Sequence, residues 1–548
     1  MSRSADLVIT GADVYCGDAS RTWASAVAVR GDRIVATGTE AEVREAVGTS
    51  TETLHLPGRL VVAGFQDAHV HTPDAGRNLL TVSLHDLPGR QGYLDHVAAY
   101  AAAHPDEPWI VGGGWAMEYF PGGNPTKEDL DSVVPDRPVF LYNRDVHGAW
   151  VNSRTLELAG ITKDTPDPVD GRIDRDPRTG EPTGTLHEGA AYTLHARLVP
   201  EPDAIEWEAA LLKGQAHLHA LGITGWQDAW VTASTEAAYR SLAADGRLTA
   251  RVVGALWWER ADGLDQVTGL LARRERGSVN GAGSYHPRAV KIMTDGVLEN
   301  FTGALLEPYC DGCGGHTDGS GTAFVEHDEL AEALCLLDLH DFQVHMHAIG
   351  DRAVRNSLDA VEAARIANGV RDNRHHIAHL QVVQPSDVLR FKDLGVVANC
   401  QTYWAQSEAQ MDDLTIPFLG PERSAMQYPF ADLLRSGARL AMGSDWAVTT
   451  ANPLEQIEVA VNRIDPEERG NAPFLPEQRL TLADALAGFT SGTAYVNHDE
   501  GESGSIEVGK RADLAVLDRN IFTEPATHVG DAKVEYTFAS GRVVYERG

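Results

Sequence analysis

Eight apolar, strand-like segments alternate with stretches of helical periodicity through the middle of this 548-residue chain. The helical stretches are clearest at 204–213 and 353–361. Such alternation is typical of a parallel sheet, and eight strand–helix units close into a barrel. We therefore predict an α/β protein built on a distorted (β/α)8 TIM barrel. The predicted strands lie near 61–69, 223–229, 249–257, 288–295, 342–347, 374–380, 395–400 and 439–445.

The two ends of the chain carry a different pattern. Short strand-like runs separated by turns fill the first 58 residues and recur after residue 498. Short strands at regular turn spacing predict a small β-sandwich. Because both ends share the pattern, we predict that residues 1–58 and 499–548 combine into one domain beside a barrel of residues 59–498.

The interval from 72 to 205 is too long for one barrel connection, and it contains strand-like runs at 108–111 and 138–142. We predict that it forms an inserted subdomain over the strand ends, where it would act as a lid. It contains polar and aromatic residues that the fold alone does not require: Trp115, Glu118, Asp145, His147, Asn152 and Glu188.

Composition narrows the classes of function. The chain is 43% hydrophobic and 23% charged, as in soluble globular proteins, and its net charge of −33 argues against nucleic acid or an anionic membrane as a partner. No apolar run reaches the roughly 18 to 20 residues that span a bilayer. The N-terminus leads directly into a strand pattern, and the five cysteines are scattered, so the cytoplasm is the expected compartment.

Cys310 and Cys313 form a Cys-x-x-Cys, followed by His316 in a glycine-rich segment. A structural zinc site usually needs four ligands, and no second cysteine pair stands nearby. We favour a flexible loop with incidental or redox-sensitive thiols over a zinc knuckle.

Polar side chains interrupt the apolar strands near their C-terminal ends. His69 and His71 are two residues apart, so on a strand they point to the same side. A buried charge needs a partner or a metal. Lysine is rare in this chain, since only seven of its 46 lysine and arginine residues are lysine. A lysine embedded in a strand is therefore unlike an ordinary surface charge. The other strand-embedded candidates are Lys291, His347, His379 and Asp445.

These motifs together resemble the amidohydrolase superfamily, specifically the amidohydrolase family 3 enzymes related to N-substituted formamide deformylase and the exoenzyme-regulator-like hydrolases. The resemblance covers nearly the whole chain, and it also implies the domain built from both termini. It rests on Gly64–His71, on Lys291 with Asp295-Gly296, on His347–Asp351, on Ile377-Ala378-His379 with Gln381, and on Gly443-Ser444-Asp445.

The resemblance implies a centre of one or two divalent metal ions, zinc first and manganese, iron, cobalt or nickel as alternatives. One ion would be bound by His69, His71 and Asp445 and the other by His347 and His379. Lys291 would bridge the two as a carbamate. A metal-bound hydroxide would attack the substrate carbonyl, and Asp445 would shuttle the proton to the leaving nitrogen.

Alternatives remain open at three of these positions. Lys291 could instead pair with Asp295 or bind substrate at a one-metal site. His345 and His347 share a strand face, as do His375 and His379, so alternation cannot choose between them. Position nearer the strand end favours His347 and His379. We expect His345 behind the ligands or in the core.

We assign His147 to substrate contact by the same resemblance, with a structural, hydrogen-bonded histidine as the alternative. An aromatic pocket is expected from residues that include Trp446, Tyr119 and Phe120, with core packing as the equal alternative for each residue taken singly. The remaining candidates for substrate binding are Trp115, Glu188, Asp295, Tyr403 and Trp404.

The predicted activity is metal-dependent hydrolysis of a carbon–nitrogen bond, other than a peptide bond, in a small N-acyl or N-formyl amine. An esterase, a lactonase or a cyclic amide hydrolase would use the same machinery, and a non-catalytic scaffold is a further alternative. The expected partner is a small-molecule substrate, and a homodimer is left open.

Overall fold

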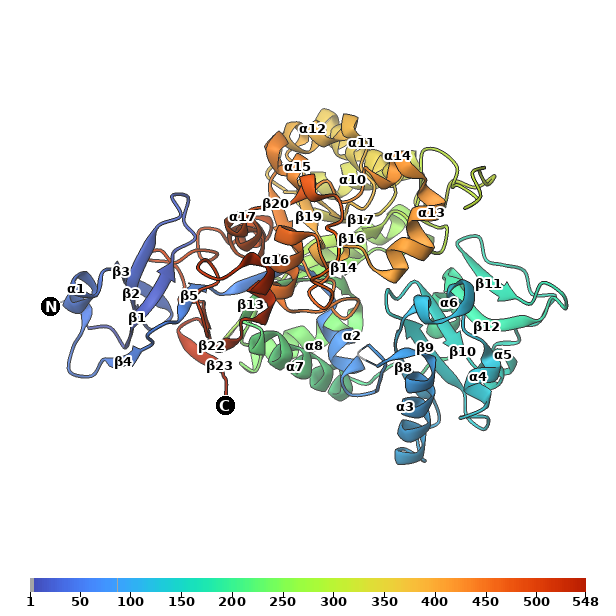
Figure 1. The fold of residues 1–548 in the computed structure, drawn as a ribbon, viewed down its shortest axis with the longest axis horizontal. Coiled ribbons are helices and arrows are strands. Elements are labelled where there is room, and N and C mark those ends of the chain that lie inside the picture. The colour runs from blue at the N-terminus through green and yellow to red at the C-terminus, as the bar shows by residue number, and fades with distance from the viewer. Residues whose placement is uncertain (1–3, 86) are drawn as a thin grey trace.

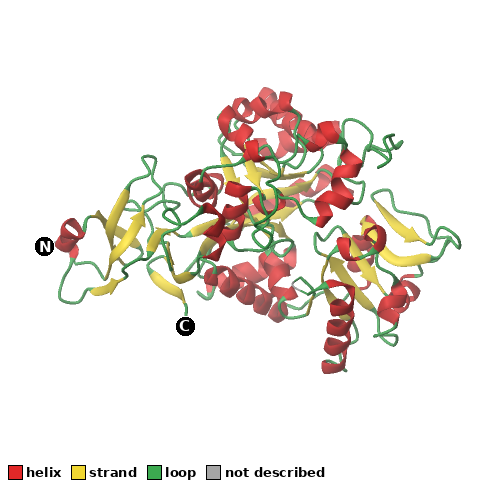
Figure 2. Ribbon diagram, in the orientation of Figure 1, coloured by secondary structure: helices red, strands yellow, loops and turns green. Residues whose placement is uncertain are grey.

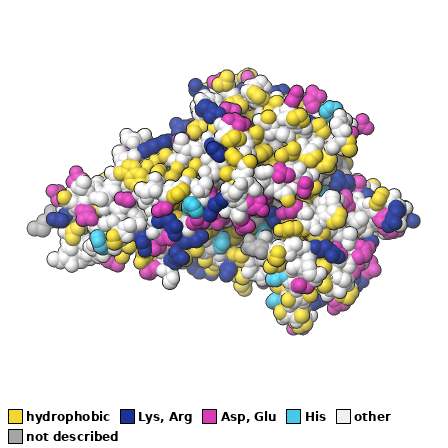
Figure 3. Space-filling view, viewed as in Figure 1, with side chains coloured by type: hydrophobic (Ala, Val, Ile, Leu, Met, Phe, Trp, Pro, Cys, Tyr) yellow, Lys and Arg dark blue, Asp and Glu magenta, His cyan; other side chains and the backbone are white. Residues whose placement is uncertain are grey.

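The computed structural model describes residues 4–85 and 87–548 and has three parts in a row (Figure 1). A sheet from both termini lies at one end, a barrel of strands and helices in the middle, and an inserted sheet with its own helices at the other end (Figure 2). Acidic and basic side chains are interspersed on the face in Figure 3. No helix in the described ranges is long and apolar enough to cross a membrane.

The central part confirms the predicted barrel. Its eight strands pair in parallel, and the path through the sheet runs from β20 to β6. Helices α7 (Ala204–Ala220) and α11 (Asp351–Asn368) include the two predicted helical stretches. The strands are β6 (Phe65–Val70), β13 (Ile223–Val231), β14 (Arg251–Trp257), β16 (Ser284–Met293), β17 (Gln343–Ala348), β18 (His376–His379), β19 (Val397–Cys400) and β20 (Leu440–Met442).

The barrel is nearly closed, and its seam lies between β20 and β6. The amide of Ser444 donates to the Asp67 carboxylate at 3.0 Å, and the amide of Asp445 donates to the carbonyl of His69 at 2.8 Å. Asp67 also accepts from the amide of His69 at 3.0 Å. These bonds bring the end of β20 against the end of β6, so Asp445 and His69 become neighbours although they are far apart in sequence.

The two termini combine, as predicted, and their strands form one mixed sheet. The order is β23 (Arg542–Glu546), β22 (Val534–Ala539), β21 (Leu514–Leu517), β5 (Leu60–Ala63), β1 (Leu7–Tyr15), β2 (Trp23–Arg30) and β3 (Arg33–Gly38), with β4 (Glu52–His55) beside β1.

The predicted barrel strand at 61–69 is in fact two strands. β5 pairs with β21 in the terminal sheet, and the barrel strand β6 begins after Gly64. A Cβ at Gly64 would lie 2.6 Å from Thr224 Cγ2, and its amide donates to the Asp513 carbonyl at 2.8 Å. The continuous apolar run hid this change of sheet, because both strands are buried on both faces.

The inserted segment folds as a six-stranded sheet. The predicted runs at 108–111 and 138–142 overlap β8 (Ile110–Trp115) and β9 (Val139–Asn143). Apolar clusters pack around it, one with Trp115 and Trp150, another with Phe140 and Leu186. Helices α3 (Gly89–Ala103) and α6 (Gly189–Leu198) flank it. The strand order is β11 (Gly171–Arg175), β12 (Pro182–Glu188), β10 (Gly148–Val151), β9 (Val139–Asn143), β8 (Ile110–Trp115) and β7 (Val82–Ser83).

Candidate metal centre and substrate cavity

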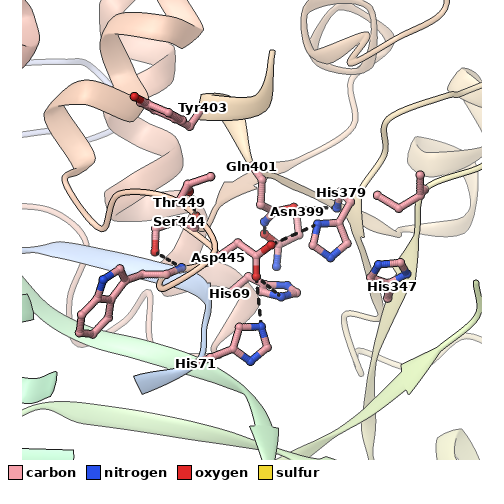
Figure 4. Close-up of polar contacts among 12 residues, drawn as sticks. His69, His71, His347, His379, Asn399, Gln401, Tyr403, Ser444, Asp445 and Thr449 are labelled. Atoms are coloured by element: carbon pink, nitrogen blue, oxygen red, sulfur yellow. Dashed lines mark hydrogen bonds and ion pairs between the residues drawn. The ribbon is translucent and has the colours of Figure 1, made fainter. Parts of the chain in front are cut away.

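Asp445 lies at the centre of the candidate site, and three histidines surround its carboxylate (Figure 4). The Nε2 atoms of His71 and His69 lie 3.1 and 3.3 Å from Asp445 Oδ1. His379 Nδ1 lies 3.9 Å from Oδ2. Burial alone would raise the pKa of Asp445, but His69 and His71 hold it well below 3.8. The carboxylate is therefore ionised at neutral pH.

His347 and His379 form the other side of the site, with ring centroids 4.5 Å apart. His347 Nδ1 lies 3.1 Å from Asp295 Oδ1, so its Nε2 is left for a ligand. The amide of His379 donates to Gln401 Oε1 at 2.7 Å. Asp295 thus fixes the orientation of the His347 ring, as is usual for metal-binding histidines, whereas Gln401 holds the backbone of His379.

Asp295 pairs with His347 rather than with Lys291, and it is not among the residues that line the cavity around Lys291. Besides His347, its carboxylate accepts from the amides of Ile349, Gly350 and Ala304, and the residue is fully buried. Four donors leave it no capacity for a further partner. Its carboxylate therefore holds the ring of His347, and its assignment to substrate binding stays a prediction.

Lys291 lies inside the barrel, 2% exposed, with Nζ 3.4 Å from His69 Nε2. Burial lowers the pKa of Lys291 to about 7. A substantial fraction of its amine is therefore neutral at neutral pH.

The donor set fits a divalent cation. His69, His379 and Asp445 offer ligand atoms that all lie within 4.8 Å of one another. Burial lowers the pKa of His69 to about 3 and the pKa values of His347 and His379 well below 6.5, so the imidazoles are neutral. Neutral imidazoles beside an ionised carboxylate are the ligands that zinc and related metals prefer.

The structure distinguishes between the two members of each histidine pair, which sequence periodicity could not do. His345 Nε2 lies 2.9 Å from His69 Nδ1, so His345 stands behind a candidate ligand, as expected. His375 is occupied elsewhere, because its Nε2 lies 3.0 Å from Asp338 Oδ1 and its Nδ1 accepts from the Val344 amide. His347 and His379 are the members of each pair that face the cavity.

His147 reaches the site from the inserted sheet. Its ring centroid lies 5.4 Å from that of His347, and its Nδ1 lies 2.9 Å from Glu188 Oε2. Burial opposes protonation, but Glu188 raises the pKa of His147 to about 9. Glu188 is fully buried and also accepts from Thr302 at 2.7 Å and Tyr192 at 3.4 Å. Glu188 therefore holds His147 from a buried position outside the cavity lining.

A cavity of about 420 Å³ opens between the barrel and the inserted sheet, and all six candidate metal ligands and His147 line it. Its remaining wall is strongly aromatic. Sequence reasoning missed these residues, although a Trp-Trp pair at the end of the predicted strand 249–257 was an available signal. The aromatic lining consists of Tyr142, Tyr192, Trp230, Trp257, Trp258 and Phe324.

Several predicted pocket residues lie elsewhere. Trp115 is 1% exposed in the core of the inserted sheet, where its Nε1 donates to the Leu141 carbonyl at 2.9 Å. The ring of Tyr403 points away from Asp445 (Figure 4). Trp404 does line a small recess of about 50 Å³ next to His147 and His379. The aromatic wall thus comes from other residues, because an apolar run does not reveal which of its faces is turned to the core.

Of the other polar residues predicted from the insert, one lines the cavity and two lie away from it. Asp145 lines the cavity and accepts from the His147 amide at 2.9 Å. Asn152 instead caps helix α5 (Ser153–Ala159). Glu118 lies 3.5 Å from Arg144.

The Cys-x-x-Cys segment lies outside the candidate centre. Arg423 Nη2 donates to Cys310 Sγ at 3.5 Å, and Cys313 is exposed. Within residues 4–85 and 87–548, the one convergent group of three or more histidine, cysteine or carboxylate donors is that of His69, His379 and Asp445.

Comparison with known proteins agrees with this geometry. A model of the amidohydrolase family matches residues 52–545. Protein LONG AFTER FAR-RED 3 of Arabidopsis thaliana is 31% identical over 555 residues, covering 99% of this chain and 92% of that protein. N-substituted formamide deformylase of Arthrobacter pascens is 30% identical over 561 residues, covering 100% and 99%. The crystal structure of an uncharacterized metal-dependent hydrolase from Pyrococcus furiosus matches with a TM-score of 0.71 and 26% identity, covering 94% of this chain and 99% of that chain.

Proposed function

The chain belongs to the amidohydrolase family, and from this premise we propose that it is a metal-dependent hydrolase of a C–N bond in a small N-acyl or N-formyl amine. The observation that carries the proposal is the convergence of neutral imidazoles, an ionised Asp445 and a buried Lys291 on one cavity. The Arthrobacter relative, a deformylase of N-substituted formamides, supports this bond type.

In this proposal His69, His71 and Asp445 hold one divalent cation, and His347 and His379 hold a second. When bound, such a cation supplies a Lewis acid that polarises the scissile carbonyl and activates water near neutral pH. Asp445 accepts the proton of the attacking water at a carboxylate oxygen and delivers it to the leaving nitrogen. Its low pKa suits it to receive that proton only transiently.

Lys291 has the properties that carbamate formation requires. A neutral amine can attack carbon dioxide, forming a bond from Nζ to carbon and releasing one proton. Burial keeps part of the amine neutral, and Nζ already lies beside His69. The product is an anion with two oxygens, which would suit Lys291 to a position between two cations, where an ammonium would be repelled.

His147 completes the proposed machinery from the inserted sheet. With Nδ1 held by Glu188, its other nitrogen is left to donate to the substrate carbonyl oxygen. A donor aimed at a developing oxyanion is among the largest contributions to acyl transfer. The aromatic wall supports an apolar N-substituent on the substrate, since aromatic surface binds apolar groups.

Metal analysis and a matched substrate panel test the proposal together. Purified protein should carry one or two divalent ions per chain, by mass spectrometry, and lose its activity on chelation. N-formyl and N-acetyl derivatives of one apolar amine should be hydrolysed faster than the esters of the matching alcohol. Faster ester cleavage would assign the same site to an esterase, and protein without stoichiometric metal after growth with added zinc would favour a non-catalytic scaffold.

A further inference from the structure

A small recess adjoins the candidate metal centre, and its wall is rich in oxygen acceptors. The recess has a volume of about 50 Å³ and opens beside His147, His347 and His379, which also line the large cavity. Apolar side chains form part of the wall, among them Val297 and Ile349. The carboxylate and amide side chains of the wall, apart from the candidate ligand Asp445, are Asp145, Glu299, Glu408, Gln381 and Gln410. The recess therefore combines apolar surface with acceptors next to the reacting centre.

Two of these side chains have no partner in the protein. Gln410 is 6% exposed, and its amide forms no hydrogen bond within the described ranges. The Glu408 carboxylate forms neither a hydrogen bond nor an ion pair with any described residue. None of these unpartnered atoms is enclosed by protein, so a molecule in the recess can contact them. Leaving a buried polar group unpaired costs free energy, and a ligand in the recess would supply the missing partners.

The wall carries an excess of negative charge. Its three carboxylates outside the candidate ligand set share the wall with one cation, His147, and Glu188 already offsets that cation at 2.9 Å. Arg144 acts on Glu408 from outside the wall, but it lies 3.5 Å from Glu118, which offsets it in turn. A divalent ion in the candidate centre would be partly neutralised by its own ligand Asp445. The recess therefore stays electronegative.

The pKa values of the wall carboxylates agree with this excess. Burial raises the pKa of Glu408 to about 7, and the charge of Asp465 adds to the shift. Burial likewise raises the pKa of Glu299. Arg463 lies behind the wall, where it donates to the carbonyl of Tyr428 at 3.2 Å, and it does not reverse either shift. A cation inside the recess would favour the ionised form of both carboxyl groups.

The spacing of the wall groups suits an organic cation rather than a second metal site. Within residues 4–85 and 87–548, only His69, His379 and Asp445 bring three ligand atoms within 4.8 Å of one another. The carboxylates of the recess are therefore too far apart to share one metal ion. An ammonium group has three donors that can reach separate acceptors, and the apolar part of the wall suits the carbons that carry it. A volume of about 50 Å³ leaves room for only a few heavy atoms.

We propose that the recess binds a protonated amino group on the acyl chain of the substrate, which makes the substrate an aminoacyl amide of an apolar amine. This inference rests on the proposed hydrolysis of a C–N bond. With the carbonyl oxygen at His147, the two substituents of the carbonyl carbon extend into different parts of the site. The aromatic wall takes the N-substituent, and the recess takes a short acyl chain whose ammonium donates to Glu299 and Glu408.

Paired amides of benzylamine test the proposal on the metal-loaded protein. The glycyl and propanoyl amides have the same shape and differ in charge, as do the β-alanyl and butanoyl amides. In at least one pair the charged member should have the higher kcat/KM, and Glu408→Gln should lower that ratio about tenfold or more, because a charged hydrogen bond is lost. Comparing ratios between variants cancels the effect of the charge on carbonyl reactivity. Glu422→Gln is the matched control and should keep the wild-type ratio, because Glu422 is exposed and forms no ion pair in the described ranges.

The outcomes separate this proposal from the hydrolase function on which it rests. Hydrolysis of the amides without a preference for the charged members, or with a preference that Glu408→Gln retains, would overturn the aminoacyl assignment and leave the hydrolase function standing. If no amide is cleaved, the hydrolase function fails, and calorimetry on the uncleaved amides still tests the recess. The charged member should then bind about tenfold more tightly than its neutral partner, and equal affinities would overturn the proposal. Glu408→Gln should keep the Tm of wild type, because Glu408 has no described partner to lose.

Discussion

Replacing His147 tests the contribution of the inserted sheet to catalysis without touching the candidate metal ligands. Glu188 occupies His147 Nδ1 at 2.9 Å, so the ring has one nitrogen left for the substrate. A single donor to an oxyanion contributes about 2.7 to 4 kcal/mol, which corresponds to 10²- to 10³-fold in kcat. We expect His147→Ala to lose that much turnover and to keep its metal.

The same substitution should also destabilise the fold, because it leaves Glu188 buried without its cation. Breaking a buried pair by removing one partner costs about 3 to 5 kcal/mol, and the hydroxyls of Thr302 and Tyr192 should keep the loss toward the lower figure. Adding Glu188→Gln to His147→Ala removes the stranded charge. The double variant should recover much of the Tm and none of the turnover.

Metal content, kcat and Tm measured on the same preparations separate these effects. His347→Ala serves as the contrast, since it should lose metal together with activity. Loss of metal in His147→Ala would place His147 among the ligands, and wild-type turnover with metal bound would remove it from the reaction. If the double variant regained turnover along with Tm, the defect of the single variant would be one of folding.

The remaining four predictions concern Lys291, Asp445, Asp338 and Trp230, with Trp115 as the control for the last. Lys291→Ala should lose at least one metal ion and most activity, with partial rescue by a short carboxylic acid, whereas unchanged metal content would exclude bridging. Asp445→Asn should lower kcat at least about 10²-fold while retaining the fold, and near-normal turnover would require another proton carrier. Burial opposes the ionisation of Asp338, but hydrogen bonds from one histidine and two asparagines lower its pKa below 3.8. Its stabilisation is therefore present above the unfolded pKa and lost as pH falls through the folded one, so calorimetry should find Asp338→Asn less stable at pH 7 and closer to wild type near pH 3. Trp230→Ala should raise KM for an aromatic N-substituent, whereas Trp115→Ala should lower Tm without that selective effect.

The barrel could be predicted from the sequence because each strand is a separate apolar run followed by a helix. The change from the terminal sheet to the barrel at Gly64 could not be predicted in this way. Strands β5 and β6 are both buried, so hydrophobicity is continuous across the point where the chain leaves one sheet for another. The close approach of Thr224 that excludes a side chain at Gly64 is a tertiary contact, and no local pattern encodes it.

The candidate ligands could be predicted for a similar reason, since polar groups at the ends of apolar strands are conspicuous. The cavity wall could not, because it depends on how the inserted sheet docks. Tyr192 and Tyr142 reach the cavity from the insert, whereas Trp115 of the same insert faces the opposite way into its core. All three stand in apolar surroundings, and only the docked structure distinguishes them.

The backbone at the site explains why its geometry escapes sequence rules. His379, Asp445 and Val146 have positive φ angles of 78°, 59° and 61°, and a β-branched residue such as valine rarely adopts that conformation. Each such residue costs about 1 to 3 kcal/mol and persists only where surrounding contacts hold it. Here the amide of His379 is bonded to Gln401 and that of Asp445 to the carbonyl of His69. Glycine would relieve the strain at any of these positions, yet each carries a side chain. The strain is therefore the cost of turning the carboxylate and imidazole toward the cavity, and the long-range bonds that sustain it belong to the fold as a whole.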